Sequence, residues 1–238
     1  MTFQQPMSTK SPDPTQLPAP VAEQLASLAL TRGKPLLIVD ADEVLFYFMR
    51  GLERFLESRD LYFDWASYAL HGNIRQRRDN APVAAEILHP LLQRFFADAT
   101  EDLDPVDGAP QALAELSRSA QIVVLSNVPM PARAARIRAL ARHGMAFPLI
   151  ANTGPKGPAV VALLKQTAGP AVFIDDIPHN HKSVADMAPA VHRLHYIADT
   201  RLAALLGPAP DCHHRAETWP DMLTHIHTLL TPSSPTAR

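Results

Sequence analysis

The chain has 238 residues, 47% of them hydrophobic, and its 24 acidic and 22 basic residues give a formal net charge of −2. This length and apolar content suffice for one domain with a full core and a smaller appended domain, which argues against a short or disordered module. The near balance of charge argues against a general nucleic-acid binder, whose surface is strongly basic.

The single cysteine, Cys212, excludes an intramolecular disulfide and argues against a structural zinc site. No apolar stretch approaches the roughly 18 residues of a membrane span, and the N-terminus lacks the layout of a secretory signal. These features predict a cytoplasmic protein, a monomer or homodimer, with neither membrane nor nucleic acid as a partner.

Both ends of the chain are predicted to be disordered tails. Residues 1–19 and 231–238 are polar and proline-rich, with too few large apolar side chains to offset the entropy lost on ordering. Between the first tail and the first strand, Val21, Leu25 and Leu28 share one helical face, and Gly33 suits the left-handed turn after a helix. A short amphipathic helix is therefore predicted over residues 20–33.

Short apolar runs then alternate with helical patterns. Continuously apolar runs are typical of strands buried on both faces, and they predict strands at residues 35–40, 121–127, 146–152, 171–176 and 191–199. Helical patterns lie at residues 108–119, 130–144, 157–169 and 218–230, and the last of these is expected to pack Met222, Ile226 and Leu229 inward. This alternation predicts an α/β fold with a doubly wound parallel sheet.

One long stretch interrupts the alternation. Residues 46–104 carry helical patterns around 45–60 and 82–99, and they are predicted to form a small α-helical domain inserted into a core of residues 20–45 and 105–230. Most aromatic residues of the stretch are expected in the insertion's own core, with one or two lining a substrate pocket: Phe46, Tyr47, Phe48, Tyr62, Phe63, Trp65 and Tyr68.

Polar side chains follow three of the predicted strands. In a doubly wound sheet, ligands bind outside the carboxyl ends of the strands, and that edge would receive Asp40 and Asp42, Ser126 and Asn127, and Asp175 and Asp176. Up to four converging carboxylates would repel one another unless a cation or altered protonation relieved them. Magnesium suits carboxylate oxygens together with water and phosphate, so a Mg²⁺ site is predicted at this edge.

These residues resemble the motifs of the haloacid dehalogenase superfamily of phosphohydrolases. "LLIVDADEVL" (residues 36–45) matches a strand followed by Asp-x-Asp, Ser126 ends the second strand, Lys156 precedes a helix, and Asp175 and Asp176 form an acidic pair after a strand. Each motif alone is weak, but the four occur in order over about residues 34–200. The resemblance implies a Rossmann-like core with a mobile helical cap between the first and second motifs.

The resemblance also implies a reaction, the hydrolysis of a small phosphorylated metabolite. Asp40 would attack phosphorus and form an aspartyl-phosphate. Asp42 would protonate the leaving alkoxide and later deprotonate water. Ser126, Asn127 and Lys156 would bind the phosphoryl oxygens, with Lys156 also steadying Asp40.

The same resemblance implies the metal ligands. Asp40, the backbone carbonyl of Asp42 and one residue of the acidic pair would hold Mg²⁺. Asp176 is the preferred direct ligand, and Asp175 is the second choice or an outer-shell residue.

The sequence departs from the family pattern in the turn after Asp42. Glu43 and Val44 stand where glycine and often threonine are usual, and Glu43 is expected to face outward. Gly157 follows Lys156 where proline is common. The first departure predicts a different turn leaving the site.

Several weaker signals remain. Arg75, Arg77 and Arg78 are interpreted as a solvated loop, with recognition of an anion as the alternative. His179 and His181 are expected on the surface, with a place in the site for one of them as the alternative. The run "DCHHRAE" (residues 211–217) is interpreted as a loop, because its metal-ligand residue types are adjacent rather than spaced to reach one ion.

Two other functions stay open. Carbon–halogen or carbon–phosphorus cleavage occurs on the same fold, but true dehalogenases usually lack an acid at the place of Asp42, and phosphonate cleavage usually uses a cap lysine, of which residues 46–104 have none. A non-catalytic binding or regulatory protein would not need to keep Asp40, Asp42, Ser126, Lys156 and Asp176 together.

Overall fold

The predicted strands form one parallel sheet in the computed structural model, which describes residues 16–230. The strand order is β5-β4-β1-β6-β7-β8, and the strands are β1 (Leu36–Val39), β4 (Gln121–Ser126), β5 (Leu149–Ala151), β6 (Ala171–Asp175), β7 (His192–His195) and β8 (His214–Arg215). Of the predicted tails, residues 1–15 and 231–238 lie outside the described residues, while Ala19, predicted within the first tail, begins the first helix. The doubly wound α/β prediction is confirmed.

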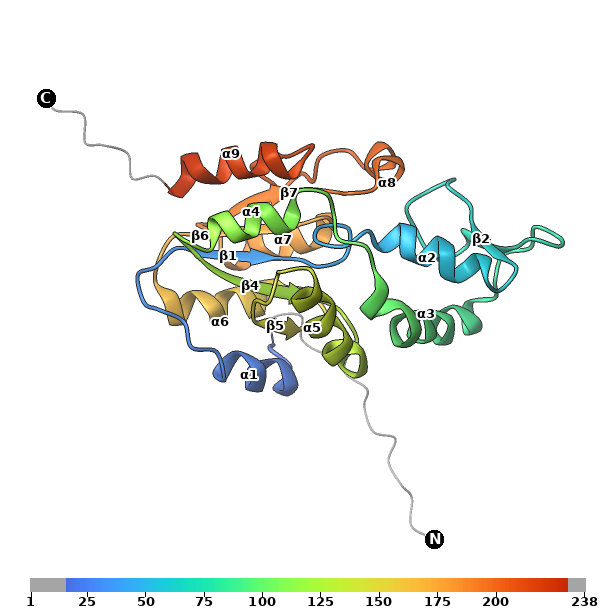
Figure 1. The fold of residues 1–238 in the computed structure, drawn as a ribbon, viewed down its shortest axis with the longest axis horizontal. Coiled ribbons are helices and arrows are strands. Elements are labelled where there is room, and N and C mark those ends of the chain that lie inside the picture. The colour runs from blue at the N-terminus through green and yellow to red at the C-terminus, as the bar shows by residue number, and fades with distance from the viewer. Residues whose placement is uncertain (1–15, 231–238) are drawn as a thin grey trace, which may run out of the picture.

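Helices cover both faces of the sheet because its strands are apolar on both faces. In β1, Leu36 and Ile38 face one hydrophobic cluster, while Leu37 and Val39 face the other. Figure 1 shows the resulting layers, with α4 and α9 on one side of the sheet and α1 and α6 on the other. The helices of the core are α1 (Ala19–Ala26), α4 (Ala109–Leu116), α5 (Arg133–Arg142), α6 (Gly157–Thr167), α7 (Pro178–Met187), α8 (Thr200–Leu205) and α9 (Trp219–Leu230).

The first helix is shorter than predicted. α1 ends at Ala26, so Leu28 lies beyond it, although Val21 and Leu25 are buried as expected. Gly33 has the predicted left-handed backbone, with φ of 82°, but it belongs to the turn before β1, where its N–H donates to the Thr167 carbonyl at 2.6 Å. The left-handed turn before β1 therefore explains this glycine, and helix capping does not.

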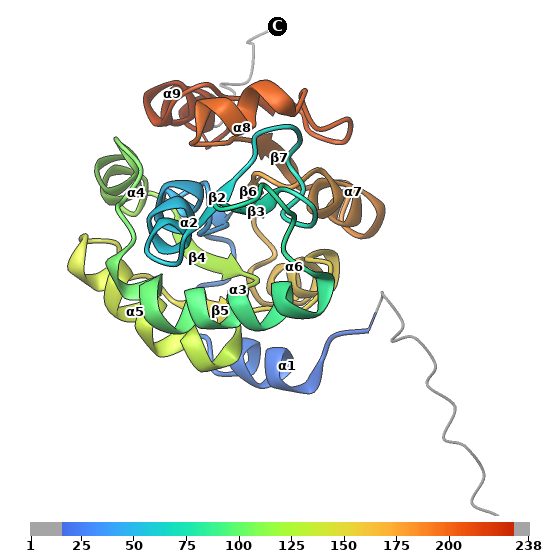
Figure 2. The same cartoon turned by 90° about the vertical axis from the view of Figure 1, so that its right-hand side faces the viewer.

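The insertion contains a small β-sheet as well as helices. Between α2 (Phe48–Glu57) and α3 (Ala85–Ala99), two antiparallel strands, β2 (Leu61–Phe63) and β3 (Ile74–Gln76), pair where no strand was predicted. Phe95 of α3 is buried between the rings of Phe48 and Phe55, at centroid distances of 5.2 and 5.3 Å. Figure 2 shows these elements lying in front of the carboxyl ends of the core strands.

The edge of the sheet next to β7 differs from the loop predicted at residues 211–217. The run at residues 211–217 is not only a loop, because it contains β8, which pairs with β7 through Leu194↔His214 and His195↔Arg215. Within the described residues, no helix combines the length and apolar character needed to cross a membrane.

The last helix is attached to the turn that follows β1. Met222 and Ile226 of α9 are buried as predicted, Leu229 is half-buried, and Trp219 at its first position is fully buried. The indole Nε1 of Trp219 donates to the Val44 carbonyl at 2.9 Å. This hydrogen bond joins α9 to the turn that follows β1.

We expect Trp219→Phe to lower the free energy of unfolding by about 2–3 kcal/mol, because it removes ring volume and leaves a buried carbonyl without its donor. Trp65→Phe is the matched control, since that half-buried indole donates to the Glu53 side chain at 3.0 Å. Denaturant unfolding of both variants measures the difference. Equal losses in the two variants would show that the buried Trp219 hydrogen bond contributes no more to the free energy of unfolding than the half-buried Trp65 one.

Candidate active site

Three strands and one helix bring the predicted site residues to one edge of the sheet. Asp40 follows β1, Ser126 ends β4, and Asp175 ends β6. Lys156 immediately precedes α6 and is fully buried. The carboxyl ends of parallel strands meet at one edge, so residues more than 100 positions apart in the sequence become neighbours.

Lys156 forms the centre of a buried cluster of charges. Its Nζ lies 2.6 Å from Asp40 Oδ1 and 2.6 Å from Asp175 Oδ2. Burial raises the pKa of Asp40 to about 7 although Lys156 acts in the opposite direction. Burial would lower the pKa of Lys156, but the two carboxylates raise it above its ordinary value, so the lysine stays charged.

The two residues of the acidic pair differ in their surroundings. Asp175 Oδ1 accepts from the Ile177 N–H at 2.8 Å and from Asn180 Nδ2 at 3.0 Å, and its Oδ2 faces Lys156. Asp176 lines the cavity described below. Burial raises the pKa of Asp176 well above its ordinary value, and the charges of Asp175 and Asp40 add to the increase.

This cluster has the donor set for a hard divalent cation. One oxygen from each of Asp40, Asp175 and Asp176 lies within 4.8 Å of the others, and all three residues are buried. A cation would relieve the repulsion between these carboxylates, which adds to the effect of burial in raising the pKa of Asp40 and Asp176. Because carboxylate oxygens are the ligands that Mg²⁺ prefers, the residues present fit this ion.

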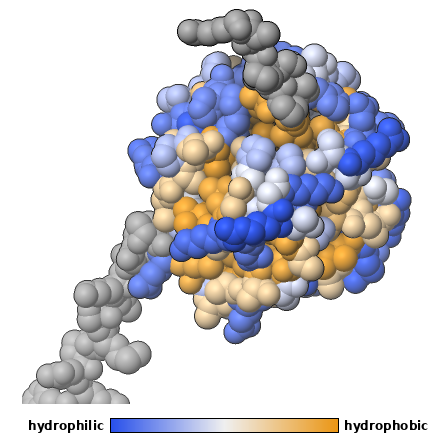
Figure 3. All heavy atoms as spheres, turned by 90° about the vertical axis from the view of Figure 1, so that its left-hand side faces the viewer, coloured by the Kyte–Doolittle hydropathy of each residue, from blue (hydrophilic) through white to orange (hydrophobic). Residues whose placement is uncertain are grey.

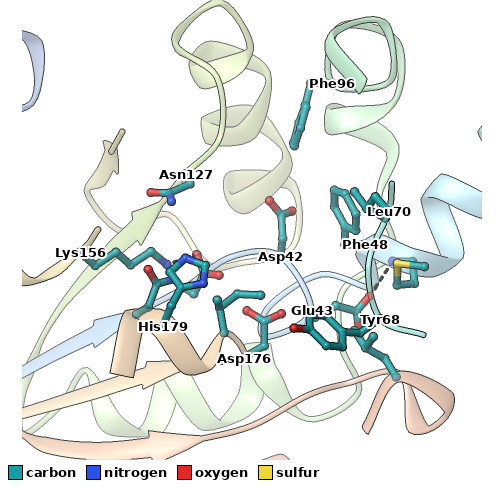
Figure 4. Close-up of a pocket in the computed structure, with 15 residues that line it drawn as sticks. Asp42, Glu43, Phe48, Tyr68, Leu70, Phe96, Asn127, Lys156, Asp176 and His179 are labelled. Atoms are coloured by element: carbon teal, nitrogen blue, oxygen red, sulfur yellow. Dashed lines mark hydrogen bonds and ion pairs between the residues drawn. The ribbon is translucent and has the colours of Figure 1, made fainter. Parts of the chain in front are cut away.

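Asp42 is held by a residue that sequence reasoning missed. Arg136 of α5 is fully buried, and its Nη2 lies 2.5 Å from Asp42 Oδ1. The guanidinium also lies over the Phe46 ring, 4.9 Å from the centroid. In Figure 4 the Asp42 side chain points away from Asp176. No motif marks Arg136, since it lies within a helix where an arginine is ordinarily exposed.

Glu43 is buried, not outward-facing as expected. Its carboxylate accepts from the Met49 N–H at 2.6 Å and from the Asp199 N–H at 2.8 Å, and its backbone has a φ of 57°. Met49 lies in the first turn of α2, and Asp199 is the N-cap of α8. Helix starts have free N–H groups that attract a carboxylate, which explains the inward position. Burial raises the pKa of Glu43 to about 7.

The residues after β4 occupy two different positions. Asn127 lines the cavity, and its side chain donates to the Gly154 carbonyl at 3.1 Å and accepts from Asn152 Nδ2 at 2.8 Å. Ser126 is fully buried and is not among the lining residues; its Oγ accepts from the Val128 N–H at 3.2 Å. Asn152 is a further residue that the motifs did not indicate.

A cavity of about 260 Å³ joins the charged cluster to the insertion. Figure 4 shows Lys156 and Asn127 on one side and apolar residues of the insertion on the other. Those apolar residues are Phe48, Met49, Tyr68, Leu70 and Phe96. Two of the aromatic residues singled out from the sequence, Phe48 and Tyr68, therefore line the cavity.

Other sequence-based expectations near the site are corrected or resolved. His179 is exposed at the mouth of the cavity, as predicted, whereas His181 is buried with its Nε2 2.9 Å from the Asp175 carbonyl, so the predicted surface position is wrong for His181 alone. None of the three arginines of the loop lines the cavity; Arg75 pairs with Asp64 at 2.9 Å. The structure favours the solvated-loop interpretation of these arginines.

Comparisons with known proteins identify the fold. No family model and no curated protein matches the sequence. Among solved structures, a haloacid dehalogenase-like hydrolase from Streptococcus pneumoniae matches with a TM-score of 0.54 at 13% identity, over 82% of this chain and 98% of that chain. A hydrolase of the same family from Deinococcus radiodurans, with bound phosphate and sodium, matches with a TM-score of 0.53 at 17% identity, over 86% and 100% of the two chains.

An L-2-haloacid dehalogenase also matches, with a TM-score of 0.53 at 13% identity, over 84% of this chain and 100% of that chain. The similar structures therefore include a carbon–halogen enzyme, and the match alone does not choose a reaction. The six-stranded parallel sheet, its charged edge and these matches lead to one conclusion: the chain has the fold of the haloacid dehalogenase-like hydrolases.

Proposed function

We propose that the protein is a Mg²⁺-dependent phosphomonoester hydrolase that acts on a small phosphorylated metabolite through an aspartyl-phosphate. The observation that carries the proposal is the placement of Asp40. Lys156 contacts it at 2.6 Å, and Asp42 and Asp176 line the same cavity. A nucleophile, an acid/base and a cation site therefore share one small space.

Asp40, Asp176 and the backbone carbonyl of Asp42 would hold the metal ion. Asp175 is the weaker candidate for direct ligation, because its oxygens already face Lys156, the Ile177 N–H and Asn180. When bound, Mg²⁺ would neutralise charge on the phosphoryl oxygens and allow an anionic nucleophile to approach. Asp175 would then act by orienting Lys156.

The side chains supply the remaining steps. An Asp40 oxygen attacks phosphorus, and the bond from phosphorus to the ester oxygen breaks. Asp42 gives its proton to the leaving alkoxide and then takes one from the water that hydrolyses the intermediate. Lys156 and Asn127 bind the phosphoryl oxygens. Ser126 is the weaker candidate for this role, because it is buried outside the lining of the cavity and its Oγ accepts from the Val128 N–H.

Arg136 has a positioning role in this scheme. It contacts Oδ1 of Asp42, which leaves Oδ2 for proton transfer. The guanidinium is immobilised by burial and by the Phe46 ring, so it restricts the rotamers that Asp42 can adopt. Proton transfer requires such placement within hydrogen-bonding reach of the leaving oxygen.

The insertion, residues 46–104, would be the cap over this site. Its contribution to the cavity is apolar, and removal of water strengthens the electrostatic interactions with a phosphoryl group. The cavity of about 260 Å³ is smaller than most drug-sized ligand pockets, which begin at about 300 Å³. This size favours a small metabolite over a phosphoprotein.

Two observations favour phosphate ester hydrolysis over carbon–halogen cleavage. A halide leaves without protonation, so that reaction has no use for the acid at Asp42. Three buried carboxylates beside one lysine also fit a cation, whereas dehalogenases of this fold usually need no metal. Carbon–phosphorus cleavage usually uses a lysine from the cap, and residues 46–104 contain none.

Asp40→Asn removes the attacking charge with little change in volume. We expect hydrolysis of a generic aryl phosphate to fall on the order of 10⁴-fold or more in this variant, and to stop in wild type when a chelator removes Mg²⁺. Asp60→Asn, an exposed residue at a positive φ that asparagine tolerates, should keep wild-type activity. An active Asp40→Asn variant, or full wild-type activity in chelator, would contradict the mechanism.

Asp42→Asn should separate the two chemical steps. With an activated aryl phosphate, phosphorylation of Asp40 needs little protonation, while hydrolysis of the intermediate still needs a base. We therefore expect turnover to fall on the order of 10²-fold or more, and phosphoenzyme to accumulate to a level that intact mass spectrometry detects. Wild-type turnover of both aryl and alkyl phosphates would remove Asp42 from the acid/base role.

Arg136→Met tests the positioning role of the arginine. We expect kcat for an alkyl phosphate to fall about 10-fold or more, with KM almost unchanged and a smaller loss for a nitrophenyl phosphate, whose leaving group needs little acid. Arg136→Lys should recover part of the loss. Arg138→Met is the control, because that exposed arginine pairs with Glu101 at 2.6 Å, away from the cavity. Equal losses on both esters would indicate a purely structural role.

A further inference from the structure

The side of the cavity that faces the charged cluster is apolar. Ile177 and Leu202 of the core line it together with the five apolar residues of the insertion, and we call these seven residues the apolar wall. Figure 4 shows Phe48 and Leu70 of this wall across the cavity from Lys156. The opposite end of the molecule also exposes apolar residues, interleaved with polar ones (Figure 3). Apolar surface alone therefore marks no site, but at the cavity it adjoins the groups that would bind phosphate.

The aromatic part of the apolar wall is held in place by rings behind it. The centroids of Phe48 and Phe96 lie 5.9 Å apart, and both rings contact the buried Phe95, at 5.2 and 5.5 Å. Phe95 in turn packs against the buried Phe55 at 5.3 Å. Because neighbouring rings restrict Phe48 and Phe96, they present apolar surface to a ligand with little loss of entropy on binding.

A second anionic group on a substrate would find no guanidinium at this wall. No arginine in the described part of the chain lines the cavity, and Lys156, which does, already contacts Asp40 and Asp175. The seven arginines of the insertion have partners elsewhere. Arg50 lies over the Tyr47 ring, 3.7 Å from its centroid. The other six pair with carboxylates: Arg54, Arg59, Arg75, Arg77, Arg78 and Arg94.

The carboxylates of the cavity also disfavour a second anion. Asp42 and Glu43 line it in addition to Asp40 and Asp176, and like charges in a partly buried space repel. Alcohols with many hydroxyl groups are disfavoured for a different reason. Hydroxyls placed against the apolar wall would lose their hydrogen bonds to water and gain none in exchange.

We propose that the substrate is the phosphate monoester of an uncharged, apolar alcohol whose hydrocarbon part lies against the apolar wall. The phosphoryl group would lie beside Lys156, and water would cleave its bond to the alcohol oxygen, giving inorganic phosphate and the alcohol. This substrate class rests on the proposed hydrolase function. Burial of the hydrocarbon part favours binding in proportion to the apolar area removed from water. Specificity then comes from the cost of placing charge or hydroxyl groups at the same wall.

Steady-state hydrolysis of four alkyl monoesters in the presence of Mg²⁺ tests the substrate class. The esters are 2-phenylethyl phosphate, the anionic 3-(phosphonooxy)propionate, glycerol 3-phosphate and phosphocholine, whose leaving alcohols are all unactivated. We expect kcat/KM for 2-phenylethyl phosphate to exceed each of the other values by about 10²-fold. If the anionic ester, the hydroxylated ester or phosphocholine is hydrolysed as well or better, the substrate class is wrong and the hydrolase function stands.

Binding of phosphonates, in which a CH₂ group replaces the ester oxygen, separates the apolar site from the catalytic function. In calorimetric titrations of the wild type with Mg²⁺, we expect Kd for 3-phenylpropylphosphonate to be about 10-fold or more below that for 4-phosphonobutyrate. This preference in a protein that hydrolyses none of the four esters would overturn the hydrolase function and keep the apolar site. Equal affinities, or a preference for 4-phosphonobutyrate, would overturn the apolar site whatever the activity.

Arginine substitutions locate the alcohol at the apolar wall. Leu70→Arg adds a cation at the half-buried part of the wall, and Tyr68→Arg adds one at a residue that is 58% exposed, where folding tolerates the change. We expect both to raise kcat/KM for 3-(phosphonooxy)propionate, relative to 2-phenylethyl phosphate, about 10-fold. Ile87→Arg is the matched control, since Ile87 is 56% exposed in α3 and does not line the cavity. An unchanged ratio in both variants, or an equal rise in Ile87→Arg, would show that the alcohol does not lie at this wall.

Discussion

The contact of one buried lysine with two buried carboxylates is the constraint on which the candidate site depends. Lys156 lies between Asp40 and Asp175, and these three residues come from the start of α6 and the ends of β1 and β6. A buried charge is tolerated only with a partner, so the lysine fixes the relative position of three elements. With Asp176 added, three carboxylates face one lysine, and the excess negative charge is what makes the cluster suitable for a cation.

The turn after Asp40 connects the charged cluster to several helices of the molecule. Asp42 is tied to α5 through Arg136, Glu43 to the starts of α2 and α8, and Val44 to α9 through Trp219. Each contact joins this short segment to a different helix. This part of the cavity wall is thus held in place by contacts with residues that lie farther from the cavity. Those residues therefore influence the geometry of the cavity without touching a substrate.

The two ends of the sheet differ in their chemistry. Oxygen donors and a lysine lie at the carboxyl ends of the strands, and imidazole nitrogens lie at the amino ends of β7 and β8. Hard cations and phosphate suit the first set.

The sequence by itself determined the strands, the alternation of helices and the presence of Asp40, Asp175 and Asp176 at one edge, because apolar runs are local features and the carboxyl ends of parallel strands meet at one edge. Lys156 was placed in the site only by the resemblance to the family's motifs. The β2–β3 pair was missed because three-residue strands are too short to show a period. The Asp42–Arg136 pair joins residues 94 positions apart, the Glu43–Asp199 hydrogen bond spans 156 positions, and the His192–His225 contact spans 33. Only the tertiary structure could decide these, since packing of whole elements, and no local pattern, selects which side chains meet.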